Sequence, residues 1–130
     1  MQQKILVVDD DESILEVIQI VLESEGYQIQ ISMNGECFQH FTGSFPDLIL
    51  LDVLLSGEDG REICKQLKRN QATAHIPVVI LSAHSDASKL ADVSGADDFL
   101  EKPFDVDVLI ETVEKHLVST RNSRKSILQP

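Results

Sequence analysis

Side chains able to carry out phosphoryl or acid–base chemistry follow the short apolar runs of this chain. Asp9 and Asp10 follow residues 5–8, Asp52 follows 48–51, Ser82 follows 78–81, and Lys102 comes soon after 99–100. In a parallel α/β sheet the carboxyl ends of the strands converge on one edge, where such folds bind their ligands. If these runs are strands of one sheet, three carboxylates, a hydroxyl and an ammonium meet in one pocket.

A carboxylate at such an edge suits phosphoryl transfer. It is a competent nucleophile toward an activated phosphoryl group, and the acyl phosphate that forms is itself reactive. Close carboxylates repel one another unless a hard cation lies among them, and Mg²⁺ takes carboxylates, waters and phosphate oxygens as ligands. The pattern therefore predicts Asp52 as the nucleophile, a Mg²⁺ site among the acids, and Lys102 and Ser82 as groups that neutralise phosphoryl oxygens.

Repeated strand–helix units would position these side chains, because short apolar runs alternate with amphipathic stretches. Apolar residues at helical spacing over 14–22 predict the first helix, with Asp11 as its N-cap and Gly26 as its stop. The other predicted elements are strands at 5–8, 27–31, 48–52, 78–82 and 99–100, a short helix through 37–41, a polar loop at 56–60, a helix around 63–67, a weakly amphipathic helix at 85–94, and a helix from Asp105, its N-cap, to about Val118. Residues 119–130 lack periodicity and are predicted to form a flexible tail.

Composition narrows the class of protein. The 130 residues suffice for one compact core, and 22 acidic against 11 basic residues disfavour direct binding to nucleic acid or anionic membranes. Met1 leads almost directly into the first strand, and no apolar stretch approaches the roughly 20 residues of a membrane span, which favours a cytoplasmic protein. Cys37 and Cys64 lack metal-binding or redox spacing and are predicted to be reduced, mostly buried thiols.

Several short motifs occur together in a fixed order. They are Val7-Val8-Asp9-Asp10-Asp11, Leu50-Leu51-Asp52, Asp59-Gly60, Leu81-Ser82-Ala83 and the segment GADDFLEKPF at 95–104. With them, the chain from about Lys4 to Val118 resembles the receiver domain of two-component response regulators. The resemblance implies a flavodoxin-like, doubly wound α/β fold: a five-stranded parallel sheet of order 2-1-3-4-5 flanked by five helices. It places the domain at 1–118 and the tail at 119–130.

The resemblance also implies roles for the acids. Asp52 matches the phosphoacceptor, and Asp9 and Asp10 match the acidic pair that holds Mg²⁺ together with Asp52. By the same pattern the backbone carbonyl of Leu54 completes the protein ligands of the metal.

Three further residues match the switching machinery. Ser82 corresponds to the switch hydroxyl, Lys102 to the invariant lysine, and Phe99 to the switch aromatic, with plain core packing as the alternative for Phe99. The Lys102–Pro103 bond is implied to be cis. Departures from the pattern are Ser56 in place of a common proline, Ser rather than Thr at position 82, and an interval from Ser82 to Gly95 about two residues short.

We interpret the chain as a phosphorylation-dependent switch, not a turnover enzyme, that catalyses its own phosphorylation and dephosphorylation. It would accept a phosphoryl group from a histidine kinase or histidine phosphotransfer protein and alter its fourth-helix, fifth-strand and fifth-helix face. That face would bind a downstream protein partner or output domain, or form a phosphorylation-dependent dimer. A Mg²⁺-dependent aspartyl-phosphate phosphohydrolase is the alternative, disfavoured because no second acid lies two residues after Asp52. A flavodoxin-like nucleotide or flavin binder would need a glycine-rich loop after the first strand.

Overall fold

The sheet at the centre of the molecule has five parallel strands. The computed structural model describes residues 2–39, 45–55, 57–83 and 94–128, with the backbone alone at residue 39 and from 118 on. The strands are β1 (Lys4–Val8), β2 (Gln28–Ser32), β3 (Leu48–Asp52), β6 (Val78–Ser82) and β7 (Asp98–Glu101). They lie in the order β2-β1-β3-β6-β7, which confirms the predicted 2-1-3-4-5 topology.

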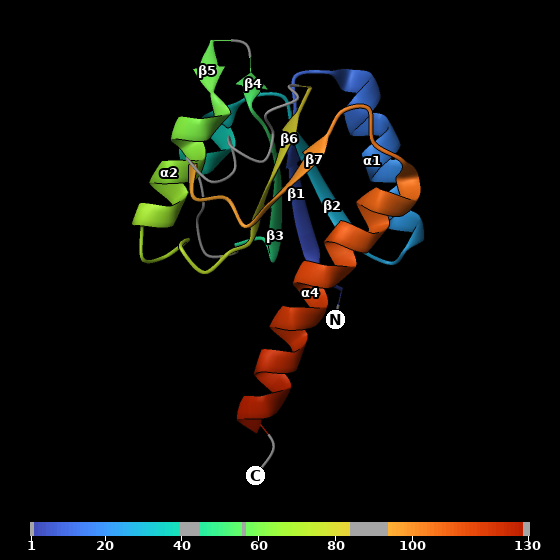
Figure 1. The fold of residues 1–130 in the computed structure, drawn as a ribbon, viewed down its shortest axis with the longest axis vertical. Coiled ribbons are helices and arrows are strands. Elements are labelled where there is room, and N and C mark those ends of the chain that lie inside the picture. Colours follow the sequence, from blue (N-terminus) through green and yellow to red (C-terminus); the bar gives the residue numbers. More distant parts are fainter. Residues whose placement is uncertain (1, 40–44, 56, 84–93, 129–130) are drawn as a thin grey trace.

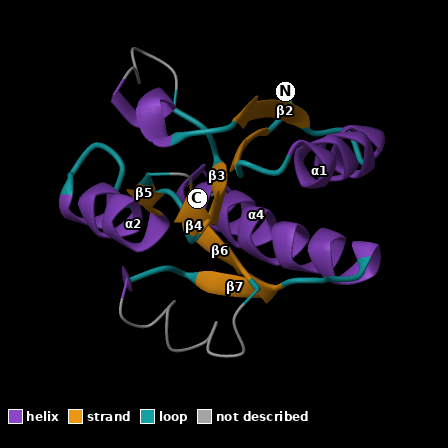
Figure 2. Ribbon diagram, turned by 90° about the horizontal axis from the view of Figure 1, so that it is seen from above, coloured by secondary structure: helices purple, strands orange, loops and turns teal. Residues whose placement is uncertain are grey.

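Helices cover both faces of this sheet (Figure 2). Helices α1 (Glu12–Ser24) and α4 (Val106–Leu128) lie on one face, and α2 (Gly60–Arg69) lies on the other. A short 3₁₀ helix, η1 (Gly35–Gln39), follows β2. Of the five helices predicted, the one at 85–94 falls almost entirely outside the described residues, and Phe41 of the predicted 37–41 helix does as well.

The central strands β1, β3 and β6 form because their apolar residues are buried on both faces, as is typical of parallel sheets, whereas the edge strands β2 and β7 are more exposed. Every residue of β3 is buried. Along β1, Ile5 and Val7 pack with the α1 and α4 residues, whereas Leu6 and Val8 pack with Cys64 and other α2 residues. One hydrophobic cluster therefore packs on each face of β1 and β3, and this packing fixes the positions of the ends of these strands.

Local signals set the ends of the first helix as predicted. The Asp11 carboxylate accepts hydrogen bonds from the backbone N–H groups of Ser13 and Ile14, so Asp11 is the N-cap of α1. Gly26, with a φ of 93°, follows the C-cap residue Glu25 and takes the left-handed conformation that favours glycine. Both Cys37 and Cys64 are free, and Cys64 is buried.

Two elements differ from the prediction. The region predicted as a polar loop contains a small antiparallel hairpin, in which β4 (Leu54–Leu55) pairs with β5 (Glu58–Asp59). Helix α4 continues to Leu128 rather than ending near Val118, so residues 119–128 are helical and extend past the end of the sheet (Figure 1). The buried residues Leu109, Val113 and Leu117 belong to the part of α4 that packs against the sheet, and the helical backbone continues beyond them.

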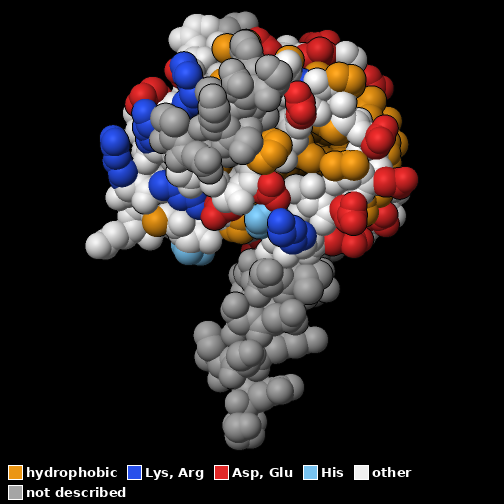
Figure 3. Space-filling model, viewed as in Figure 1, with side chains coloured by type: hydrophobic (Ala, Val, Ile, Leu, Met, Phe, Trp, Pro, Cys, Tyr) orange, Lys and Arg blue, Asp and Glu red, His pale blue; other side chains and the backbone are white. Residues whose placement is uncertain are grey.

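Charge is unevenly distributed over the described surface. Arg61, Lys65, Lys68 and Arg69 all belong to α2, and Figure 3 shows Lys and Arg side chains gathered on the side where Figure 1 places that helix. Acidic side chains crowd the opposite side, around α1. Within the described residues, no helix is both long enough and apolar enough to cross a membrane.

Candidate phosphorylation and metal site

Asp52 ends the central strand β3 at the carboxyl edge of the sheet, the upper edge in Figure 1. Asp52 is only 5% exposed. The Asp52 Oδ1 atom lies 3.4 Å from the backbone N of Leu54 and 3.4 Å from the Nζ atom of Lys102. One nearly buried carboxylate thus lies between the end of its own strand and a lysine that arrives from the segment after β7.

Asp9 and Lys102 form the shortest ion pair of the site. Lys102 Nζ donates a hydrogen bond of 2.8 Å to Asp9 Oδ2, and Asp9 is fully buried. The other oxygen, Asp9 Oδ1, accepts a 2.9 Å hydrogen bond from the backbone N–H of Asp11. Asp9 therefore uses both carboxylate oxygens to join the end of β1 to Lys102, 93 positions further along the chain.

Burial and neighbouring charges shift the pKa values of Asp52 and Lys102. Burial, followed by the negative charge of Asp9, raises the pKa of Asp52 although Lys102 opposes the shift. Burial disfavours the charge on Lys102, but its hydrogen bond and ion pair with Asp9, followed by the contacts with Asp52, raise the pKa of that ammonium. The site therefore favours the charged form of Lys102 and disfavours the ionised form of Asp52.

Three carboxylates at this edge fit a hard divalent cation. One oxygen atom from each of Asp9, Asp10 and Asp52 lies within 4.8 Å of the other two. Oxygen atoms such as those of carboxylates are the ligands that Mg²⁺ prefers. Burial and the charge of Asp9 raise the pKa of Asp52, and a cation among the carboxylates would lower that pKa by offsetting their repulsion. The acids predicted from the sequence are therefore brought together, and their chemistry suits the predicted metal.

Ser82 and Lys102 are linked through the backbone. Ser82 ends β6 and is 1% exposed, and the backbone N–H of Lys102 donates a 2.7 Å hydrogen bond to the Ser82 carbonyl oxygen. The Lys102–Pro103 peptide bond is cis, as the resemblance implied. Both residues thus lie at the carboxyl edge, next to the strand that ends in Asp52.

Two predicted residues occupy more exposed positions. Leu54 is 59% exposed and Phe99, on the edge strand β7, is 37% exposed. Phe99 is therefore not fully buried, and its switching role stays a prediction beside the alternative of core packing. Ser56 and the segment 84–93, which includes His84 and the shortened interval, lie outside the described residues.

Two neighbours of the site were not predicted from the sequence. Gly60 begins α2 against the backbone of β3: a Cβ atom there would overlap the Asp52 carbonyl oxygen and lie 2.9 Å from the Val53 Cα. Glu58 on β5 accepts a hydrogen bond from the backbone of Gly35. The Asp59-Gly60 motif in the sequence could have indicated the role of Gly60. No sequence pattern indicated that of Glu58, because its hydrogen-bond partner lies 23 positions away.

Proteins with closely similar sequences are response regulators. The DNA-binding dual master transcriptional regulator RpaA of Synechocystis is 40% identical over 120 residues, which is 90% of this chain and 50% of that protein. The response regulator ArlR of Staphylococcus saprophyticus is 36% identical over 128 residues, or 96% of this chain and 56% of that protein. This chain therefore spans about half the length of the curated relatives it matches.

Solved structures give the same relationship. A putative response regulator from Chloroflexus aurantiacus superposes with a TM-score of 0.85 at 31% identity, covering 91% of this chain and 99% of that chain. A CheY-like response regulator receiver domain protein from Methanospirillum hungatei superposes with a TM-score of 0.84 at 25% identity, covering 95% and 99% respectively. Residues 5–114 match the family described as response regulator receiver domain. The chain belongs to the response regulator receiver domain family.

Proposed function

We propose that this domain is a phosphorylation-dependent signalling switch in which Asp52 accepts a phosphoryl group from a histidine kinase or histidine phosphotransfer protein. A carboxylate oxygen of Asp52 forms the new P–O bond as the P–N bond to the donor histidine breaks, and the imidazole leaves as the neutral base after taking up a proton. Membership of the receiver family supports this reaction class. One observation carries the assignment to Asp52: its buried carboxylate ends the central strand within 3.4 Å of the Lys102 ammonium.

The surrounding groups have complementary tasks in this proposal. Asp9, Asp10 and the Asp52 carboxylate would hold Mg²⁺, with the Leu54 carbonyl as a further ligand. Bound there, Mg²⁺ would neutralise oxygens of the transferring phosphoryl group. The Lys102 ammonium and the Ser82 hydroxyl would neutralise the remaining oxygens, because both residues lie at the same sheet edge as Asp52.

The switch would pass from the site to the edge of the sheet. A phosphoryl group on Asp52 offers Lys102 and Ser82 new partners, and both residues are joined to β7 through the backbone hydrogen bond between them. Phe99 lies on that strand and is 37% exposed. We therefore propose the face formed by β7 and α4, with the segment before β7, as the surface that changes on phosphorylation.

The phosphodonor would dock beside α1. A hollow of about 470 Å³ lies between α1 and the segment Lys102–Phe104, and Lys102 lines both this hollow and the Asp52 site. Val17, which also lines it, is 50% exposed, and Ile20 one turn further is 62% exposed. Because Lys102 joins this apolar helix face to Asp52, we propose that an apolar surface of the donor packs against it.

The output partner is proposed to be a protein or an attached output domain. Relatives such as RpaA are named as DNA-binding proteins, and this chain spans about half of them. The formal net charge of −11 disfavours nucleic-acid contact by the receiver surface itself.

Incubation with acetyl phosphate and Mg²⁺, followed by intact mass measurement, tests the reaction. The parent should gain the mass of one phosphoryl group, and Asp52→Asn should gain none while keeping the parent's circular dichroism spectrum. Asp107→Asn, an exposed acid on α4, is the matched control and should label like the parent. Labelling of the folded Asp52→Asn variant at another residue, or rapid catalytic release of phosphate without a labelled intermediate, would contradict the proposal.

A further inference from the structure

The hairpin that follows Asp52 is held at its far strand by a contact outside the site. Only Val53 separates Asp52 from β4, so the position of the hairpin sets the backbone of Leu54. The Leu54 and Asp59 backbones pair across the hairpin, as do those of Leu55 and Glu58. Whatever holds β5 therefore also holds the backbone beside the phosphoacceptor.

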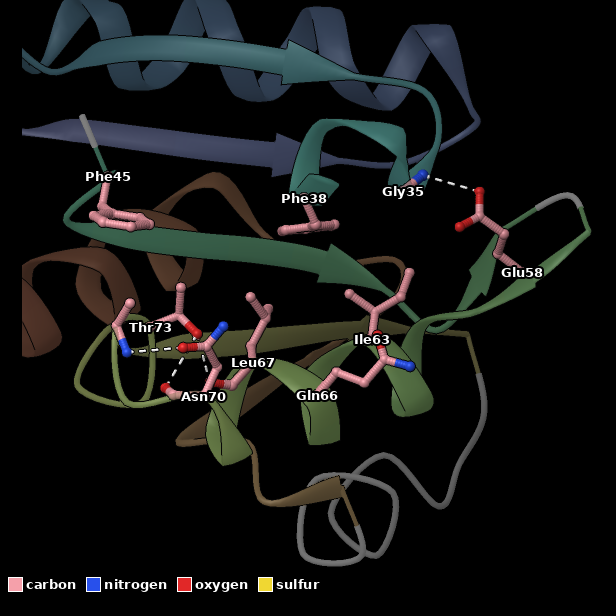
Figure 4. Close-up of a pocket in the computed structure, with 10 residues that line it drawn as sticks. Gly35, Phe38, Phe45, Glu58, Ile63, Gln66, Leu67, Asn70 and Thr73 are labelled. Carbon is pink, nitrogen blue, oxygen red and sulfur yellow. Dashed lines mark hydrogen bonds between the residues drawn. The ribbon is translucent and has the colours of Figure 1, made fainter. Parts of the chain in front are cut away.

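Glu58 provides that contact through its side chain, as Figure 4 shows. Its Oε1 atom accepts a 3.0 Å hydrogen bond from the backbone N–H of Gly35, at the start of η1. The fit is close: a Cβ atom on Gly35 would overlap Glu58 Oε2 and lie 2.9 Å from Ile63 Cδ1. Glycine at position 35 is thus what lets the Glu58 carboxylate reach the backbone.

The other end of the hairpin is anchored at the start of α2, where the Asp59 carboxylate accepts a 2.9 Å hydrogen bond from the backbone N–H of Arg61. The backbone N–H of Gly60 donates a 2.9 Å hydrogen bond to the Val53 carbonyl oxygen, and Gly60 packs directly on the Asp52 carbonyl. The hairpin is therefore fixed at its base by Gly60 and held laterally by Glu58. Of these two anchors, only the second reaches a different part of the fold, the β2–η1 connection.

We propose that Glu58 is a positioning residue for the cation and phosphoryl site, acting through its hydrogen bond to Gly35. This inference rests on the proposed function and deepens it. The bond holds β5, and through the hairpin pairing it holds the Leu54 backbone in the position where its carbonyl completes the Mg²⁺ ligands. Outer hydrogen bonds of this kind orient metal ligands, and their loss lowers metal affinity.

A charge effect makes a different prediction from a hydrogen-bond effect. If Glu58 acted only as a nearby negative charge that attracts cations, glutamine would be as harmful as alanine. If it acts through the Gly35 bond, Glu58→Gln keeps an amide oxygen that accepts the same hydrogen bond. Gly35→Ala should reproduce the effect of Glu58→Ala, because the added methyl group displaces the Glu58 carboxylate without substituting any residue that is proposed to hold the metal.

The experiment compares Mg²⁺ binding by calorimetry for the parent, Glu58→Gln, Glu58→Ala, Gly35→Ala and the double variant Glu58→Ala/Gly35→Ala. Glu62→Ala is the matched control, since it removes an exposed carboxylate that pairs with Lys65 on the outside of α2. Amide hydrogen exchange of Leu54 and Gly60 in EDTA gives a second readout that needs no metal. A thermal melt of each variant checks that it remains folded.

We expect Glu58→Ala and Gly35→Ala each to bind Mg²⁺ about tenfold more weakly. The double variant should be no weaker than either, because both substitutions break one contact. Glu58→Gln and Glu62→Ala should bind like the parent, and exchange at Leu54 and Gly60 should accelerate only in the alanine variants at 58 and 35. Equal losses for Glu58→Gln and Glu58→Ala, or a lower melting temperature with unchanged Mg²⁺ affinity and exchange, would overturn the inference. Absence of Mg²⁺ binding by the parent would instead overturn the proposed function, and the exchange data would still decide the role of Glu58.

Discussion

Lys102 is bound more closely to Asp9 than to Asp52: its Nζ atom lies 2.8 Å from Asp9 Oδ2 and 3.4 Å from Asp52 Oδ1. The lysine therefore offsets the repulsion between two buried acids at the carboxyl edge of the sheet. The lysine also lies within 3.4 Å of Asp52, so a phosphoryl group on Asp52 would be close enough to bind the same ammonium.

Replacing Lys102 by Met should destabilise the metal-free domain by about 1–3 kcal/mol, because a buried Asp9 carboxylate loses its charged partner. Mg²⁺ should raise the stability of this variant more than that of the parent, since the cation then replaces the positive charge that Lys102 provides to the cluster. Urea denaturation with EDTA and with Mg²⁺ measures both effects. A variant as stable as the parent in EDTA would show that the pair contributes little.

The pH dependence of stability should change on replacing Asp52. Burial and then Asp9 raise the pKa of this carboxyl above its ordinary 3.8, so the folded protein keeps a proton that the unfolded chain has already lost. This contribution favours folding less and less as the pH rises from about 3.8 through the raised pKa, and it stays at its least favourable value above that. Asp52→Asn removes it.

In EDTA, Asp52→Asn and the parent should therefore converge in stability at low pH, and the variant should be the more stable at neutral pH. Urea melts over a pH series measure this difference. Asp107→Asn serves as the control because that acid is exposed on α4. A difference that does not change with pH would refute the electrostatic explanation.

Asp10→Ala should weaken Mg²⁺ binding and stabilise the metal-free domain by about 0.5–2 kcal/mol, the usual range for relieving a functional conflict. The reason is the close approach of the Asp9, Asp10 and Asp52 carboxylates. Calorimetry measures the first effect and a thermal melt in EDTA the second. A variant clearly less stable than the parent in EDTA would count against carboxylate repulsion at this site.

Leu54 should slow loss of the phosphoryl group. Its side chain is 59% exposed two residues after Asp52, and it offers no hydrogen bond to orient an attacking water. Leu54→Asn or Leu54→Glu should change the rate by about tenfold, equivalent to about 1.4 kcal/mol of barrier. Loss of label from the purified domain in Mg²⁺ measures this.

Ile20→Asn is the control for Leu54, because Ile20 is 62% exposed on α1 and equally apolar. It should decay at the parent rate. If both Leu54 variants also decay at that rate while folded, Leu54 merely packs against the loop. The companion prediction for His84 concerns a residue outside the described part of the structure.

Local sequence patterns determined the buried strands and the cap of the first helix. Continuous burial of residues 48–52 and 78–82 follows from their apolar runs, because a strand covered on both faces needs no polar alternation. Asp11 caps α1 through its own neighbours. The acids at strand ends were predicted to converge because parallel strands share one carboxyl edge, and the order of the strands followed from the resemblance to receivers.

Only the tertiary structure decided how distant segments meet. Lys102 lies closer to Asp9 than to Asp52 because of where the segment after β7 packs. Lys102 and Asp9 are 93 positions apart in the sequence, and no periodic pattern of residues predicts a contact over that separation. The Glu58–Gly35 bond likewise depends on the packing of α2 and η1 against β3, and both partners read locally as loop residues. The extension of α4 past Val118 was not predicted because the sequence signal was the stripe of apolar residues that ends at Leu117, and residues 119–128 lack that periodicity although their backbone is helical.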